Sequence, residues 1–277
     1  MPPNFAQRTQ IAHDTIKRSP ELVAEHAAAG ASLDGIFHKQ QLPALGPAPD
    51  VDSHTPSSVD IINTDAFTLA RRLLKDDPSA KIAVLNLASD ILPAGPWLHG
   101  AMSMTQEEAL CYSSTLYVTL KPEYYPWPNL GEGSAAGIFS PGVVVFRDDL
   151  DHNCVELPKE DRRVVSVITV AAPCGPRLTR DYEEFAEPSV LRDLQEKIRL
   201  VYRMAATNGQ RYLVLGAMGC GAYACPPRRV ALEMRDVLLE PEFSGWFKKV
   251  VFAVYSRPEN GPGNFGIFEE VFKDVSV

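Results

Sequence analysis

The chain has 277 residues, of which 45% are hydrophobic and 22% charged, and its 27 basic against 35 acidic residues give a net charge of -8. At about 150 residues per domain this length allows one large or two small domains, and the composition argues against disorder over most of the chain. No apolar run reaches the roughly 18 residues that span a bilayer, and residues 1–15 lack the apolar segment of a secretory signal. We expect an intracellular protein, cytoplasmic or nuclear, without a membrane anchor, and the acidic charge argues against broad binding of nucleic acid.

The cysteines and histidines do not form a metal-binding pattern. The five cysteines include no C-x-x-C pair, and the six histidines are scattered, with no H-x-x-x-H pair to share a helix face. An odd number of cysteines in a chain of this size indicates reduced thiols rather than a disulfide framework. We therefore expect no metal site.

The N-terminal part of the chain differs in pattern from the rest. Residues 1–30 are predicted to be helical from the spacing of Arg8, Ile11 and Thr15, with Pro20 expected to begin or separate a second short helix over 21–29. Residues 42–60 are rich in proline and small polar residues and predict a surface loop. We expect residues 1–58 to be an extension packed on a main domain of residues 59–277, because they are too few to hold a core of their own.

From residue 59 onward, strand and helix patterns alternate. Apolar runs predict strands over 59–62, 81–87, 143–146, 164–170, 212–215 and 250–255. Amphipathic spacing predicts helices over 65–75, 105–120, 188–208, 228–239 and 267–272. This order is typical of an α/β domain with three layers and helices on both faces of the sheet. Ligands in such domains bind beyond the carboxyl ends of the strands.

The loop after the strand at 81–87 leads to a pair of carboxylates. Residues 86–100 contain two glycines and two prolines and run on to Gln106-Glu107-Glu108 at the start of a helix. Acidic residues in a first turn also suit the helix dipole without any catalytic role. Neighbouring helical residues diverge by about 100°, so only one of Glu107 and Glu108 can face a given reacting bond. The other could hold a sugar hydroxyl.

Two further loops at strand ends carry candidate binding residues. Gly219-Cys220-Gly221-Ala222-Tyr223 follows the strand at 212–215, and its glycine amides could hold an anion, although such loops often serve only as tight turns. It is neither a P-loop nor a complete dinucleotide fingerprint. The last strand leads to Asn264-Phe265, which offers a polar edge and an aromatic face for an adenine, or else packs into the core.

Taken in order, these stretches resemble the microbial-type poly(ADP-ribose) glycohydrolases, a branch of the macrodomain superfamily. The resemblance covers nearly the whole chain: the N-terminal helix, Asn63-Thr64-Asp65, VLNLAS, TQEEALCYSSTLY, SPGVVVFRDD, VITVAAP, LVLGAMGCGAYACPP and VVFAVYSR with the later NF. It implies a macrodomain-like mixed sheet with an N-terminal helical extension. It also implies cleavage of ribose–ribose O-glycosidic bonds of poly(ADP-ribose), with no cofactor.

The resemblance carries functional roles onto single residues. The second glutamate of the Gln-Glu-Glu run is the family's general acid and the first positions a ribose, which implies these roles for Glu108 and Glu107. Ser89 would lie near that ribose, and Gly219-Cys220-Gly221 would hold the pyrophosphate, with Ala222 beside them and Tyr223 against the distal ribose. The implied partner is ADP-ribose or poly(ADP-ribose) on modified proteins, and we expect a monomer.

The chain departs from the family at the triple-glycine loop. Here Ala94-Gly95-Pro96 stands in its place, and ten residues, Pro96 to Thr105, precede Gln106. Ala94 adds a side chain, and Pro96 removes a backbone donor and fixes φ near about -65°. The loop is therefore expected to differ in shape from the family's.

Three other functions fit the same residues. The altered loop suggests a hydrolase restricted to terminal or single ADP-ribose units. A non-catalytic ADP-ribose reader is also compatible with the fold, although keeping both Glu107 and Glu108 argues against it. A cysteine hydrolase using Cys220 has no histidine close in sequence and is the weakest of the three.

Overall fold

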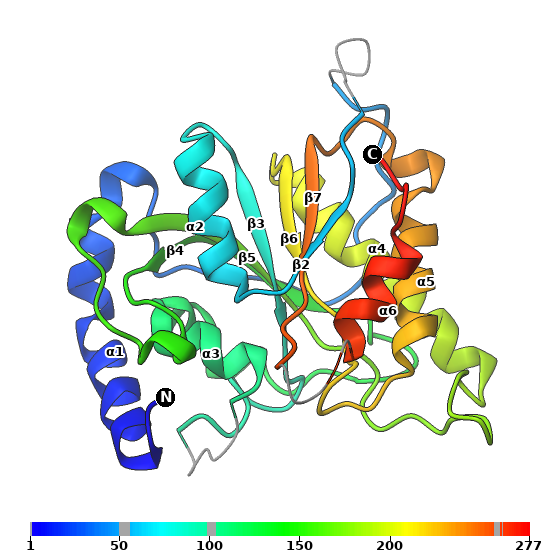
Figure 1. The fold of residues 1–277 in the computed structure, drawn as a ribbon, viewed down its shortest axis with the longest axis horizontal. Helices are drawn as coiled ribbons and strands as arrows, with labels where there is room; N and C mark the ends of the chain where they lie inside the picture. Colours follow the sequence, from blue (N-terminus) through cyan, green and yellow to red (C-terminus); the bar gives the residue numbers. More distant parts are fainter. Residues whose placement is uncertain (1, 50–55, 99–103, 258–260, 262) are drawn as a thin grey trace.

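The computed structural model describes residues 2–49, 56–98, 104–257, 261 and 263–277, and these build one mixed sheet of seven strands in the order β1-β4-β5-β3-β6-β7-β2 (Figure 1). The strands are β1 (Ile36–His38), β2 (Asp60–Ile62), β3 (Ile82–Leu87), β4 (Gly137–Val145), β5 (Arg163–Val170), β6 (Tyr212–Leu215) and β7 (Lys249–Ala253). β4 runs antiparallel to both of its neighbours, β1 and β5, and the remaining pairs are parallel.

Helices cover both faces of this sheet. They are α1 (Phe5–Glu25), α2 (Ala66–Asp76), α3 (Gln106–Ser113), α4 (Pro188–Thr207), α5 (Pro227–Leu238) and α6 (Gly263–Val271). Figure 1 shows α1, α2 and α3 to one side and α4, α5 and α6 to the other. α1 lies against α3 rather than against the sheet alone. The α/β fold in three layers is confirmed.

Alternation along the central strands produces two hydrophobic cores. In β3, Ala83 and Leu85 face the core that contains α4, α5 and α6, whereas Ile82 and Val84 face the core that contains α2 and α3. Because successive side chains of a strand point to opposite faces, an unbroken apolar run is what a strand covered on both faces requires.

Several element boundaries differ from the predicted ones. α1 runs through Pro20 as one helix, since Pro20 lies on an exposed turn where only one hydrogen bond is lost. α3 is shorter than expected and is followed by a separate 3₁₀ turn, Leu116–Thr119, while α6 begins earlier, so Asn264 and Phe265 lie in its first turn.

The N-terminal segment also contributes to the sheet. β1 was not predicted, and it forms an edge of the sheet by pairing Ile36 with Phe139. Part of the predicted Pro-rich loop, residues 50–55, lies outside the described residues. In the described part of the chain, no helix is long and apolar enough to cross a membrane.

Candidate active site

A cleft of about 680 Å³ opens beyond the carboxyl ends of the parallel strands. Its walls come from the segments that follow β2, β3, β5, β6 and β7, together with the start of α3 and residues 149–152. This is the position expected for a ligand in an α/β sheet, and the volume is within the usual range for a small-molecule site, about 300–1,000 Å³.

Gln106 fixes the start of α3 to the central strand. β6 pairs with β3 only as far as Val84, so the next backbone groups of β3 on that side need other partners. The Gln106 carboxamide accepts from the Leu87 N–H at 2.8 Å and donates to the Leu85 carbonyl at 2.7 Å. The side chain thus continues the hydrogen-bond ladder and sets where the following two glutamates lie.

Glu107 faces the cleft although only 3% of it is exposed. One carboxyl oxygen accepts from the Asn86 side chain at 3.0 Å, and the other accepts from the Ser89 N–H at 2.8 Å. Burial disfavours the charged form and raises the pKa of Glu107 to about 8, against these two hydrogen bonds and with a contribution from the charge of Glu108. A carboxyl with this pKa is protonated at neutral pH and can donate a proton.

Glu108 is equally buried but occupies another face of α3. Its Oε2 accepts from the Thr105 N–H at 3.2 Å and completes a capping box with that residue. Its carboxyl lies close enough to Tyr112 to act on the pKa of that phenol, which burial raises to about 12. Among the described residues, Glu107 lines the cleft and Glu108 does not.

The Ala94-Gly95-Pro96 segment packs over Glu107. Ala94 and Gly95 both have left-handed backbone, with φ of 57° and 54°, and the Ala94 N–H donates to the Glu107 carboxyl. A left-handed conformation is what glycine adopts at no cost and alanine adopts at a cost of roughly 1–2 kcal/mol. The residues after Pro96 that the altered spacing affects include 99–103, which lie outside the described part of the chain.

The loop after β6 forms the facing wall. Gly219 has φ of 74°, and a Cβ there would lie 2.6 Å from the Ala172 Cβ, so only glycine fits. Tyr223 packs partly against both cores, and its hydroxyl donates to Asp90 at 3.0 Å. The Asn264 side chain donates to the Cys220 carbonyl at 3.3 Å and so links α6 to this loop.

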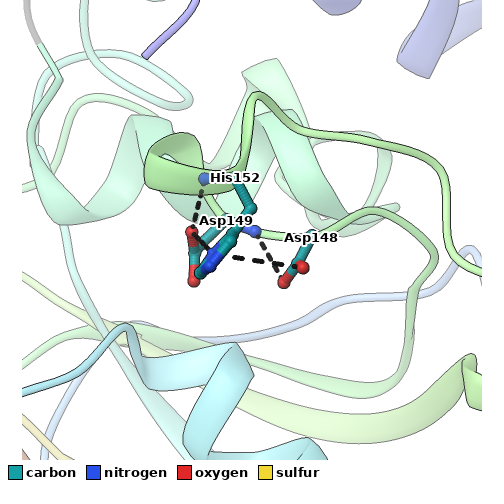
Figure 2. A group of neighbouring side chains, drawn as sticks. All are labelled: Asp148, Asp149 and His152. Carbon is teal, nitrogen blue, oxygen red and sulfur yellow. Dashed lines mark hydrogen bonds and ion pairs between the residues drawn. The ribbon is translucent and has the colours of Figure 1, made fainter. Parts of the chain in front are cut away.

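An acidic cluster lies beside the cleft, on the segment that follows β4. Asp148, Asp149 and His152 have ligand atoms within 4.8 Å of one another (Figure 2). These atoms already form ion pairs: Asp149 with His152 at 2.7 Å and Asp148 with Arg71 at 3.0 Å. The hydrogen bond to Asp149 raises the pKa of His152. The cluster is thus an ion-pair network that borders the cleft through Asp149 and His152.

Most of the predicted site residues meet in this one cleft. Those lining it are Ser89, Gly95, Gln106, Glu107, Gly219, Gly221, Ala222, Tyr223 and Asn264. Of the described residues predicted for the site, Glu108, Cys220 and Phe265 are not part of the lining, and Phe265 packs against the core.

Sequence reasoning missed two buried residues that hold the site together. Asn86 lies within the strand predicted over 81–87, and Asp90 lies three residues after its end. The sequence places both polar residues within or beside a strand predicted to be covered on both faces. A polar side chain that is buried there requires a hydrogen-bond partner, and this was the signal that could have identified them.

The chain is similar in sequence and in structure to poly(ADP-ribose) glycohydrolases. A family model described as "Microbial-type PARG, catalytic domain" matches residues 26–148. A poly(ADP-ribose) glycohydrolase structure from Thermomonospora curvata is 27% identical, with a TM-score of 0.73, covering 95% of this chain and 98% of that one. The Deinococcus radiodurans glycohydrolase in complex with ADP-ribose is 33% identical, with a TM-score of 0.64, covering 80% and 86%. A comparison with curated protein sequences found no match.

Proposed function

Because the chain belongs to the microbial-type poly(ADP-ribose) glycohydrolases, an enzyme family of ADP-ribosyl hydrolases, we propose that it cleaves the ribose–ribose O-glycosidic bonds of poly(ADP-ribose) and releases ADP-ribose. The observation that carries this proposal is the shared cleft, in which the start of α3, with its Glu107-Glu108 pair, and a glycine-rich loop lie around one ligand-sized space. ADP-ribose occupies the D. radiodurans relative, which supports the same ligand here.

The reaction needs a proton on the leaving oxygen, a stabilised oxocarbenium-like sugar and one water. The glutamate pair supplies a proton donor from the chain itself, so the proposed chemistry requires no metal. The amides of the Gly219–Tyr223 loop hold the diphosphate, and Ser89 and Gly95 border the reacting ribose.

We assign proton donation to Glu108 and ribose binding to Glu107, as the family resemblance implies. Glu108 also accepts a hydrogen bond from the Thr105 N–H through Oε2 and so caps α3. The reverse assignment, with Glu107 as donor, is favoured by its place in the cleft and its pKa of about 8. The two assignments give opposite outcomes in matched variants.

The test compares Glu107→Gln and Glu108→Gln, using release of ADP-ribose from poly(ADP-ribosyl)ated protein and calorimetric binding of ADP-ribose. Loss of a general acid lowers kcat by about 10²–10⁴. We expect this loss in Glu108→Gln with binding retained, and weakened binding in Glu107→Gln. The converse result would assign the donor to Glu107. The distant Glu242→Gln, at an ion pair with Arg203, should match the wild type.

Substrate range is tested with the same protein. Release of ADP-ribose from long chains supports the proposal, whereas release only from singly modified protein would replace it by a hydrolase for mono-ADP-ribose. Binding of ADP-ribose without release after long incubation would identify a reader.

A further inference from the structure

Asp90 is a buried carboxylate behind the cleft wall that the proposed chemistry leaves without a role. It is 3% exposed and does not line the cleft formed by the described residues. A charge at such a position requires hydrogen bonds or a counter-charge. Its partners therefore indicate what the residue holds in place.

Three segments converge on Asp90. Its Oδ1 accepts from the Tyr223 hydroxyl and from the Asn129 side chain, each at 3.0 Å, and its carbonyl accepts from the Trp127 N–H at 3.1 Å. Asn129 in turn donates to the Ala172 carbonyl at 2.9 Å. The Asp90 carboxylate thus joins the loop after β3 to the loop after β6 and to Asn129, and Asn129 extends this link to the loop after β5.

A buried lysine lies beneath this junction. Lys197 on α4 is fully buried, and its ammonium donates to the Ser134 carbonyl at 2.7 Å. Burial lowers the pKa of Lys197 to about 8, and the charge of Asp90 acts in the opposite direction. The two charges therefore lie close enough to stabilise each other inside the protein.

The neighbour of Asp90 contacts the other half of the site. The Ser89 N–H donates to Glu107, while the Asp90 side chain accepts from Tyr223. Two consecutive residues, Ser89 and Asp90, thereby fix the position of Glu107 relative to Tyr223 and the Gly219–Tyr223 loop. We propose that Asp90 is a positioning residue, which holds Tyr223 in the cleft wall so that a bound ADP-ribose meets Glu107 and the Gly219 loop together.

This inference rests on the proposed function and is tested by a double-mutant cycle on the full chain. The variants are Asp90→Ala, Asp90→Asn, Tyr223→Phe and Asp90→Ala with Tyr223→Phe. The measurements are calorimetric Kd for ADP-ribose, and KM and kcat for its release from poly(ADP-ribosyl)ated protein. The matched control is Tyr212→Phe, which breaks a similar bond, from Tyr212 to Asp77 at 2.9 Å, at the opposite end of β6.

We expect Asp90→Ala and Tyr223→Phe each to raise Kd and KM by about tenfold, the equivalent of one hydrogen bond to a charged group, with kcat within about twofold. The double variant should be no worse than the worse single variant, because both remove the same bond. Asp90→Asn keeps an acceptor oxygen and should stay within about threefold of wild type. Tyr212→Phe should lower stability without changing Kd.

Other outcomes overturn the inference. If Asp90→Ala binds like the wild type, or if the two single effects multiply in the double variant, Asp90 does not act through Tyr223. If Asp90→Ala fails to fold, the test compares the Kd for ADP-ribose of Tyr223→Phe with that of Tyr212→Phe. Equal Kd values for these two variants would overturn the inference. A wild-type protein that neither binds nor releases ADP-ribose would refute the proposed function itself, and the positioning role with it.

Discussion

Replacing Glu107 by glutamine should remove a pH dependence of stability that the wild-type chain carries. Burial raises the pKa of Glu107 from 4.5 to about 8 in the folded chain. Between these two pKa values the folded chain holds one proton more than the unfolded chain. The free energy of unfolding therefore falls by about 1.4 kcal/mol per pH unit as the pH rises.

The sign follows from the direction of the shift. The contribution of Glu107 is fully present below the unfolded pKa of 4.5 and is lost as the pH rises through about 8. From about pH 5 to about pH 8 the loss amounts to about 4 kcal/mol, a large part of the 5–15 kcal/mol typical of a domain. Glutamine does not titrate and has nearly the same shape, so Glu107→Gln should lack this slope.

The assay is urea unfolding of both proteins at several pH values between about 5 and 8. The difference in unfolding free energy between wild type and Glu107→Gln should fall steadily with pH. Glu242→Gln serves as control, because the hydrogen bond from Arg203 lowers the pKa of Glu242 and its contribution is lost only as the pH falls. A level difference for Glu107→Gln across this window would show that Glu107 is ionised in the folded chain, and the reasoning would fail.

Three further substitutions test the loops around the site. Ala94→Gly should change stability by less than about 1 kcal/mol in urea unfolding, because relief of the left-handed strain offsets the loss of a buried methyl. Gly219→Ala should cost about 2 kcal/mol or more and weaken calorimetric ADP-ribose binding, since its Cβ would lie 2.6 Å from Ala172. Gln106→Leu should lower the unfolding free energy by about 1–3 kcal/mol, because the Leu87 N–H is left without its partner. Full stability of either of the last two variants would contradict the geometry described above.

The sequence predicted the central strands and the position of the cleft, but it did not predict the short edge strand or the contacts within the cleft. Apolar runs such as 81–87 and 164–170 identify central strands because both of their faces are buried. The position of the cleft follows from the parallel order of the strands alone. β1 was missed because only three residues, partly exposed, form it, and its partner β4 comes about a hundred residues later in the chain.

The different surroundings of Glu107 and Glu108 could not be predicted from the sequence. Glu108 contacts its own helix start through a capping box with Thr105, a signature that the sequence analysis did not use. The surroundings of Glu107 depend on Asn86 and Ser89, which belong to another element. A sequence pattern shows that one glutamate faces the cleft but not which one, because that depends on how α3 is rotated against β3.

The Ala94-Gly95-Pro96 segment forms a hydrogen-bonded turn beside Glu107. Ala94 has left-handed backbone, its N–H donates to the Glu107 carboxyl, and its methyl group is buried in the core. Two backbone hydrogen bonds hold this turn: the Gly95 N–H donates to the Leu92 carbonyl, and the Trp97 N–H donates to the Ala94 carbonyl. Pro96 lies between these donors, so its missing N–H removes no bond from the turn. Pro96 is therefore compatible with this turn, and the Glu107 carboxyl beside it keeps its hydrogen bond from Ala94.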